Sequence, residues 1–306
     1  MSVQTPIELV RSTDFWFDDG TIILQVGNTL YRVYRGLLAS RSTVFHDTFS
    51  MPQPESTMEE HNQIEGCPVV QLHDKERDFT HFLKALHHYG SYKGMAVSGV
   101  MELSSVLRLS DKYDVATLRE SMVSILCDIY PSSLDEWLKR DEAVPPGYRI
   151  ARQDCLTVLN LARELNIRSI LPGAMYLVAV TQGLSVLYGG PGKRIRNVDD
   201  RKRYTLAFPE LMLARRRVAA TFLIREEEVD DCENEEGECD TERFCWLAED
   251  LPSEPDPLKG ELYWNDFDVC SPCLEQARET YNEAREELWD SLPDIFDLGT
   301  WEELLA

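Results

Sequence analysis

The hydrophobic positions near the start of the chain follow a strand-like pattern. Residues 21–26 form a run rich in β-branched side chains, and residues 30–34 form a second short run. Gly27 and Asn28 lie between the two runs and tolerate positive φ, so the segment predicts a β-hairpin. A third short strand is predicted over residues 69–72.

Apolar positions then change to helical spacing. Residues 37–49 predict two short helices, of which Ser42 can cap the second. Over residues 79–89, apolar side chains recur at i, i+3, i+4, i+7 and i+10, which predicts an amphipathic helix with an inward stripe. Residues 103–129 predict a helical hairpin that turns at Asp114.

A second helical region is predicted after a segment that is broken by prolines. Helical spacing resumes at Cys155, and residues 170–180 predict a buried helix. Pro209 stands at a favoured first helical position and is predicted to open a helix that runs to Ile224. The three arginines at 215–217 would lie in this helix, and we expect them to pair with carboxylates further along the chain.

Charge divides the chain into two chemically different parts. The whole sequence carries 54 acidic and 31 basic residues, a formal net charge of −23. Residues 226–306 alone hold 28 acidic and 4 basic residues, so the rest is nearly neutral. This balance argues against binding nucleic acids or anionic membranes, because phosphate groups require cations. Since no apolar run approaches the ~20 residues of a membrane span, we expect a soluble protein of the cytoplasm or nucleus.

Motifs typical of enzymes are not found in the sequence. All six histidines lie between residues 46 and 88, and the chain contains neither a glycine-rich phosphate loop nor a nucleophile elbow. Acidic residues are abundant, but abundance without a pocket assigns no general acid or base. The prediction is a protein without catalytic activity.

The acidic part contains paired cysteines. Cys239 and Cys245 form one pair, and Cys270 and Cys273 form a second pair about 25 residues later. Four thiolates suffice for a closed tetrahedral site, so these residues are predicted to bind one structural zinc ion. Cys232 could replace Cys239. Two other interpretations stay open at this point, namely reduced cysteines without a metal and a redox-active pair.

The order of elements over residues 12–130 resembles that of a BTB/POZ domain. The segments that carry the resemblance are Asp-Asp-Gly at 18–20, Arg-Gly-Leu-Leu-Ala-Ser-Arg-Ser at 35–42, and Leu-Ser-Ser-Val-Leu-Arg-Leu-Ser-Asp-Lys-Tyr-Asp-Val at 103–115. The resemblance implies an α+β fold, in which a small sheet with helices is followed by a helical C-terminal region.

The resemblance also divides the rest of the chain into two regions. Residues 150–225 are similar in placement to the helical, BACK-like unit that often follows such domains, and residues 226–306 form an acidic helical tail. More narrowly, the chain resembles fungal BTB proteins whose tails carry paired cysteines and end in a recurring aromatic pattern. The matching residues here are Trp289, Leu292, Pro293, Phe296, Leu298 and Trp301.

The resemblance also implies a function and site residues. It implies a non-enzymatic interaction module that binds itself or a partner protein, including a substrate adaptor for a cullin-type ubiquitin ligase. The alternative is a transcription- or chromatin-associated regulator that acts through partner proteins, with the acidic tail as the contact.

Two sets of residues are candidates for binding partners. Asp18, Asp19 and Arg35 match the polar centre of a dimer groove, where opposite charges fix the register; the alternative is a solvated turn and a surface arginine. A cullin scaffold would contact residues that point outward beside the apolar stripe of the helix at 79–89, here called the Phe79 stripe. These residues are expected to be Asp74, Asp78, His81 and Lys84. The Phe79 stripe itself is expected to be core.

Overall fold

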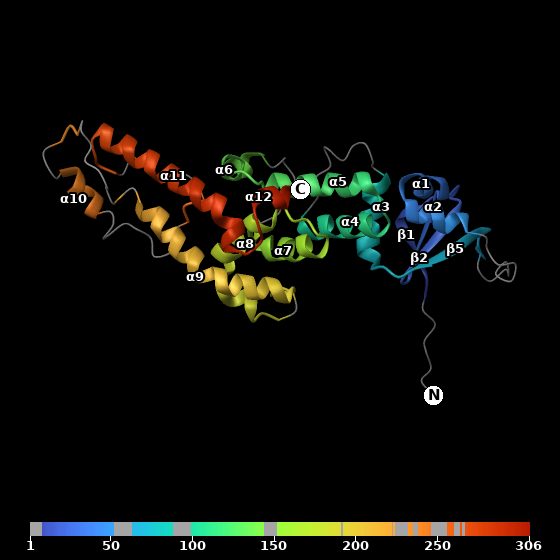
Figure 1. Cartoon of the computed structure of the whole chain (residues 1–306). Coiled ribbons are helices and arrows are strands. Elements are labelled where there is room, and N and C mark those ends of the chain that lie inside the picture. Colours follow the sequence, from blue (N-terminus) through green and yellow to red (C-terminus); the bar gives the residue numbers. More distant parts are fainter. Residues whose placement is uncertain are drawn as a thin grey trace. The chain divides into compact units, whose positions relative to one another are not determined.

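The computed structural model describes residues 8–51, 63–87, 99–143, 152–190, 192–221, 223, 232–234, 238–245, 256–259, 264 and 267–306. The chain divides into two compact units (Figure 1). The first comprises Met1–Ile125 with Pro146–Arg149, and the second comprises Leu126–Pro145 with Ile150–Ala306. The domain boundaries expected from the sequence, at residues 130, 150 and 225, stay predictions.

A small sheet forms one part of the first unit, with the strand order β1-β3-β2-β5-β4. Its strands are β1 (Val10–Trp16), β2 (Ile22–Val26), β3 (Thr29–Val33), β4 (Gln63–Ile64) and β5 (Cys67–Leu72). Strands β2 and β3 pair antiparallel across Gly27, whose φ is +57°, so the predicted hairpin is confirmed. The sheet is curled, and Glu65 beside β4 forms ion pairs with Arg11 of β1 and Arg32 of β3.

The two outer strands were not predicted from the sequence. Strand β1 pairs parallel with β3, and β4 pairs antiparallel with β5. Most side chains of β1 are exposed, because one edge and much of one face are open to solvent. An edge strand of this kind lacks the clear alternation of a half-buried strand, and therefore escapes pattern analysis.

Two short helices follow the hairpin, as predicted. They are α1 (Arg35–Arg41) and α2 (Thr43–Ser50), and Ser42 separates them in an extended backbone conformation. Ser42 Oγ accepts a hydrogen bond from the Phe45 N–H at 3.0 Å and donates one to the Tyr113 carbonyl at 2.5 Å. The predicted N-cap is confirmed, and it also fixes α2 against the end of a later helix.

Three longer helices complete the core of this unit. They are α3 (Glu76–His87), α4 (Val100–Lys112) and α5 (Ala116–Ile129), of which the residues up to Ile125 belong to this unit. Phe79, Phe82 and Leu86 of α3 are completely buried, which confirms that this stripe is core. Helices α4 and α5 form the predicted hairpin, and Asp114 takes a φ of +49° in the turn between them.

The second unit is helical in the residues that the structure describes. Its elements are α6 (Leu134–Ala143), the 3-10 turn η3 (Arg152–Asp154), α7 (Cys155–Glu164), α8 (Leu171–Gln182), the 3-10 turn η4 (Gly183–Leu187), α9 (Val198–Thr221), α10 (Glu238–Cys245), α11 (Ser271–Ile295) and α12 (Trp301–Leu305). Helix α8 is buried over most of its length, as predicted. Helices α9 and α11 lie side by side (Figure 1).

Aromatic residues attach the C-terminal helices to the rest of the second unit. The Trp289 ring lies 4.9 Å from the Trp137 ring and stacks on Trp301 at 5.6 Å between centroids. Trp289 Nε1 also donates to the Ser132 carbonyl at 2.9 Å. Trp137 and Trp289 are each at most 1% exposed, so this contact removes a large apolar area from water and holds one end of α11 in place.

The predicted start of α9 is wrong. The helix begins at Val198, and Pro209 lies in its interior rather than at its first turn. Asn197 marks the true N-terminus, since its side-chain oxygen accepts a hydrogen bond from the Asp200 N–H at 2.9 Å. Pro209 is tolerated because it lies on the exposed face, where water can bind the carbonyl that loses its helical donor.

A buried ion pair fixes the same helix on its inner face. Asp200 is 1% exposed and accepts hydrogen bonds from Arg163 Nε and Nη2, both at 2.7 Å. This bidentate geometry links α7 to α9. Among the described helices, none is long and apolar enough to cross a membrane.

Candidate metal centre and candidate interaction surface

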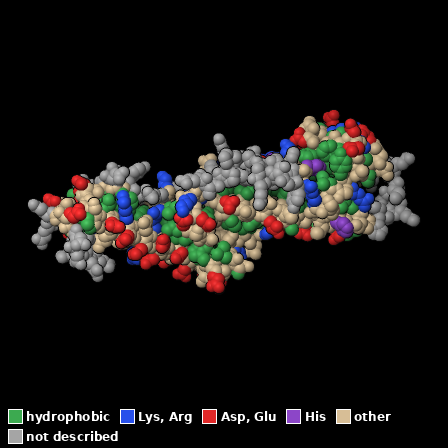
Figure 2. Space-filling model, turned by 90° about the horizontal axis from the view of Figure 1, so that it is seen from above, with side chains coloured by type: hydrophobic (Ala, Val, Ile, Leu, Met, Phe, Trp, Pro, Cys, Tyr) green, Lys and Arg blue, Asp and Glu red, His purple; other side chains and the backbone are tan. Residues whose placement is uncertain are grey.

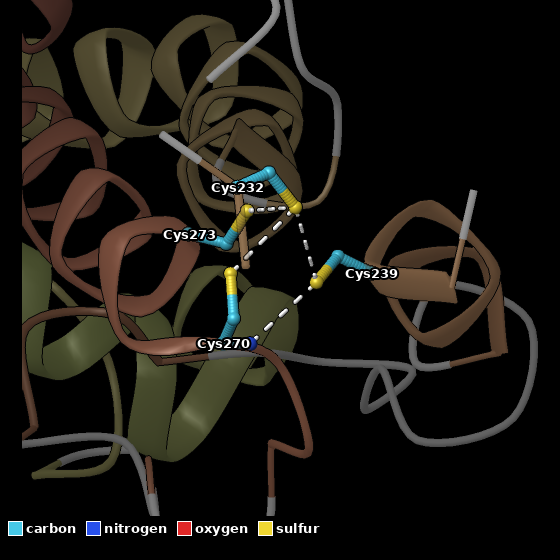
Figure 3. A group of neighbouring side chains, drawn as sticks. All are labelled: Cys232, Cys239, Cys270 and Cys273. Carbon is cyan, nitrogen blue, oxygen red and sulfur yellow. Dashed lines mark hydrogen bonds between the residues drawn. The ribbon is translucent and has the colours of Figure 1, made fainter. Parts of the chain in front are cut away.

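Four cysteine side chains of the second unit point toward one another (Figure 3). They are Cys232, Cys239, Cys270 and Cys273, and all four sulfur atoms lie within 4.8 Å of one another. Cys232 Sγ lies 3.7 Å from Cys270 Sγ, 3.7 Å from Cys273 Sγ and 3.9 Å from Cys239 Sγ. Tetrahedral zinc with Zn–S bonds of about 2.3 Å requires sulfurs about 3.8 Å apart, so these separations fit such an ion.

The local sequence explains why two of these thiols converge. Cys270 is the N-cap residue of α11 and Cys273 is the third residue of the helix, so the Cys-x2-Cys spacing spans its first turn. Pro272 occupies the first turn, where a missing N–H costs nothing. Because a helix N-terminus carries partial positive charge, it favours the thiolate forms that a metal needs.

The other two thiols come from separate segments. Cys239 lies in the first turn of α10, and its sulfur accepts hydrogen bonds from the Asn234 side-chain amide at 3.3 Å and the Cys270 N–H at 3.5 Å. Arg243, one turn further along α10, is 3% exposed and donates to the Cys273 carbonyl at 3.2 Å. Cys239 and Arg243 thus both link α10 to the start of α11.

The thiols of Cys270 and Cys273 differ in their pKa values. Burial by itself opposes ionisation of Cys270, but hydrogen bonds from the backbone at Glu233 and Cys273 and from neighbouring thiols lower its pKa to about 6. Burial and the adjacent thiols of Cys270 and Cys232 raise the pKa of Cys273 to about 12. One sulfur of the cluster therefore ionises first, and its negative charge disfavours ionisation of the next.

The structure brings Cys232 into the cluster in place of Cys245. Cys245 ends α10 and is exposed. It follows Cys239 by six residues, which is about 240° around a helix, so one helix cannot direct both thiols to one point. The spacing could have indicated this, whereas the approach of Cys232 depends on the path of the chain between distant segments.

The structure places the candidate dimer residues on the surface of the first unit. Asp18 and Asp19 are exposed in the turn before β2, and the Tyr34 hydroxyl donates to Asp19 Oδ1 at 2.8 Å. Arg35 is exposed at the start of α1, where it donates to the Phe49 carbonyl and lies over the Phe49 ring. Their described side-chain contacts are therefore to these neighbours rather than to one another.

The residues considered for a cullin surface have four different environments. Asp74 has a side chain only 7% exposed; it pairs with Lys112 at 2.5 Å and accepts from the Tyr113 hydroxyl. Asp78 accepts from Ser105 Oγ at 2.8 Å. In the described part of the chain, His81 Nδ1 is buried without a hydrogen-bond partner.

Lys84 is the most accessible member of this set. Its side chain is 42% exposed and pairs with Asp14 of β1 at 2.8 Å, which lowers the pKa of that carboxyl. Asp74 instead supports the interior of the unit. Of the four residues, Lys84 therefore offers the most surface to a partner, and Asp74 offers the least.

Comparison with known proteins identifies the first unit. No curated protein matches this sequence. Residues 16–130 match the model of the BTB/POZ domain family. This range contains strands β2 to β5 and helices α1 to α5, whereas β1 lies before it except for Trp16. The chain therefore carries a BTB/POZ domain, a protein–protein interaction module, over residues 16–130.

Proposed function

We propose that this chain is a non-enzymatic interaction protein whose BTB/POZ domain binds a second copy of itself or a partner protein. The observation that carries this proposal is the exposed edge strand β1. Its first residue, Val10, is 58% exposed, and Leu9, which precedes the strand, is 42% exposed. An edge strand with exposed apolar side chains is a template for adding a strand from another chain.

Sedimentation of the full chain at micromolar concentrations tests the self-association. We expect a dimer, because the strand edge and its apolar side chains are buried together on pairing. The double variant Leu9→Glu/Val10→Glu should sediment as a monomer, since two carboxylates on the edge repel a second copy. Met101→Glu is the matched control, because Met101 is 50% exposed on α4 of the same unit.

A cullin-type ubiquitin ligase scaffold is a more specific partner for the same domain. The accessible Lys84 and the neighbouring Asp78 on α3 would contribute to that surface. Pull-down of a purified cullin N-terminal region by the full chain, weakened by Lys84→Glu, would support the adaptor role. If the wild type is monomeric and retains no cullin, both versions of the proposed function fail.

A second candidate function is supported by the charge of α11. Its exposed acidic residues are Glu275, Glu279, Glu283, Glu286, Glu287, Asp290 and Asp294. Acidic side chains gather over the second unit in the view of Figure 2 (left half). Such a face attracts basic partners, as a chromatin-associated regulator requires. Binding of a Lys-rich histone-tail peptide tests this role. The affinity should fall steeply as salt increases, and it should also fall in Glu283→Lys/Glu287→Lys. Absent binding, or binding that does not depend on salt, would exclude the role.

We propose further that Cys232, Cys239, Cys270 and Cys273 bind one structural zinc ion in the second unit. The sulfur separations and the position of Cys270 and Cys273 at a helix N-terminus support this site. Four thiolates leave no open coordination position, so the ion would stabilise the fold rather than catalyse a reaction.

Metal analysis of protein purified without added zinc tests this site. We expect about one equivalent of zinc per chain in the wild type, and almost none in Cys270→Ser/Cys273→Ser. Cys245→Ser is the matched control and should keep its zinc, because this thiol is exposed and lies outside the cluster. Metal-free wild-type protein, or loss of zinc in Cys245→Ser, would contradict the assignment.

A further inference from the structure

Helix α9 is apolar on two faces, and the second unit covers only one of them. The inner face buries Tyr204, Ala207, Leu211 and Val218. On the other face, Val198, Leu206 and Leu213 are 66%, 69% and 51% exposed. The described part of the chain does not cover these apolar side chains, although they share their face of α9 with charged residues.

The exposed apolar side chains form a continuous stripe. Leu206, Pro209 and Leu213 stand at i, i+3 and i+7, which places them on one side of the helix over about 10 Å. Pro209 has no N–H, so the Thr205 carbonyl on this face lacks its usual helical donor. The face therefore offers two large apolar side chains and a backbone acceptor.

Basic residues border this stripe at both ends. Lys202 lies one turn before Leu206, and Arg216 and Arg217 lie one turn after Leu213. All three are exposed, and none forms an ion pair with a described residue; the expected pairing of residues 215–217 with carboxylates further along the chain stays a prediction. Arg215 is different, because it is buried and lies over the Tyr176 ring at 5.9 Å.

The charge of this face stands out against the rest of the molecule. The chain carries a formal net charge of −23, yet here the three cations outnumber the two exposed acids, Asp199 and Glu210. A partner of acidic character would meet attraction at this face and repulsion over most other surfaces of the second unit. The pair Arg216 and Arg217 would be its strongest contact.

A second copy of the chain does not fit this face well. The acidic surface of α11 would supply carboxylates, but its exposed positions are almost entirely charged or polar. It would leave Leu206 and Leu213 facing charged side chains, which gains little from burial. The face instead requires an occupant that brings both apolar side chains and carboxylates.

We propose that the exposed face of α9 is a docking site for an amphipathic helix of a partner protein. The apolar stripe of that helix covers Leu206 and Leu213, and its carboxylates lie opposite Arg216 and Arg217. This site belongs to the second unit and is independent of the BTB/POZ interface. A protein with both surfaces joins two partners, one at each unit.

Fluorescence anisotropy with the full chain tests the docking site. The probe is a labelled 14-residue peptide with Leu at i, i+3, i+4 and i+7 and Glu at most other positions. We expect saturable binding in the micromolar range that weakens as salt increases. Replacement of the Glu residues by Lys in a second peptide should weaken binding at least tenfold, because Arg216 and Arg217 then face like charges.

Variants of the chain locate the binding surface. Leu206→Asp/Leu213→Asp should weaken binding of the Glu peptide at least tenfold, and Arg216→Ala/Arg217→Ala should remove most of the salt dependence. Leu184→Asp is the matched control, because Leu184 is 44% exposed on η4 and should leave binding unchanged. All replaced residues are exposed, and circular dichroism checks that each variant is folded.

Absence of saturable binding, equal affinity for the Lys peptide, or unchanged affinity in Leu206→Asp/Leu213→Asp would each overturn the proposal. A decrease in sedimenting mass for that variant would also overturn it, since the face would then be an interface between copies. Failure here leaves the BTB/POZ proposal intact, because Leu9→Glu/Val10→Glu tests a different surface.

Discussion

At the scale of single residues, the acidic side chain of Asp74 stabilises the interior of the BTB/POZ domain. Asp74 accepts a hydrogen bond from the Tyr113 hydroxyl and pairs with Lys112. The Tyr113 ring stacks on Phe45 at 4.5 Å and lies between core aromatics. Burial and the neighbouring Asp74 carboxylate raise the pKa of Tyr113 far above its usual value. The pair connects the loop before α3 to the end of α4.

Loss of this hydrogen bond should lower the stability of the domain. Tyr113→Phe should reduce the free energy of unfolding by about 1–2 kcal/mol at pH 8, because the buried Asp74 side chain loses a hydrogen-bond donor. The Tyr113 pKa is raised in the folded state, so its contribution is present below pH 10 and is lost as the pH rises.

Urea unfolding of both proteins at pH 8 and pH 10.5 measures this effect. The difference between wild type and Tyr113→Phe should narrow at the higher pH. Tyr188→Phe is the matched control, because Tyr188 is 88% exposed. This variant should have the same free energy of unfolding as the wild type at both pH values. A difference that grows with pH would show that the phenol is not held in its protonated form.

At the scale of elements, α9 combines two competing requirements. Its inner face is fixed by Asp200 and a row of apolar residues, so the helix continues through Pro209 although proline disfavours a helix interior. Packing of the inner face outweighs the helix-breaking preference of proline. The carbonyl that loses its donor lies on the solvent side of the helix, where water can bind it. The proline is therefore tolerated rather than required by the fold.

Replacement of this proline should stabilise the second unit. Pro209→Ala restores an N–H donor for the Thr205 carbonyl, and alanine is a better helix former than proline. The free energy of unfolding should therefore rise by about 1–2 kcal/mol. Pro293→Ala in α11 should bring no gain, because Pro293 is buried and its loss leaves a gap. Thermal unfolding of both variants measures the difference, and a lower midpoint for Pro209→Ala would contradict this account.

At the scale of the whole molecule, α11 is held at its two ends by different means. The cysteine cluster lies at its N-terminus, and Trp289 packs on Trp137 near its C-terminus. A helix of 25 residues is about 37 Å long, so the two attachments act on different regions. The surrounding part of the chain is strongly acidic and repels itself, which opposes compact packing of this helix.

Removal of the proposed zinc ion should therefore have a local effect. A chelator should increase hydrogen exchange around Cys232, in α10 and in the first turn of α11, while the region of Trp289 stays protected. Trp289→Ala should instead destabilise the second unit as a whole, by about 3–5 kcal/mol. Hydrogen exchange followed by mass spectrometry separates these effects, and loss of protection at both ends after chelation would show that the ion supports the entire unit.

The sequence by itself determined the features that depend on neighbouring residues. The hairpin at Gly27, the Ser42 cap, the inward stripe of α3 and the turn at Asp114 all follow from backbone preference and periodicity over a few residues. These same local signals carry the resemblance to a BTB/POZ domain. The paired cysteines also led to the prediction that Cys239, Cys270 and Cys273 lie together, and the structure brings these three thiols into one cluster.

Only the tertiary structure decided which side chains meet across long stretches of chain. Cys232 joins Cys239 because the chain brings it beside the start of α11, whereas Cys245 faces away on α10. Asp74 is buried because Tyr113 and Lys112 reach it from α4 and the turn that follows. Helix α9 passes through Pro209 because its inner face is packed. Apart from the direction of Cys245, which its spacing from Cys239 could have indicated, these outcomes depend on contacts between distant segments, for which local spacing carries no information.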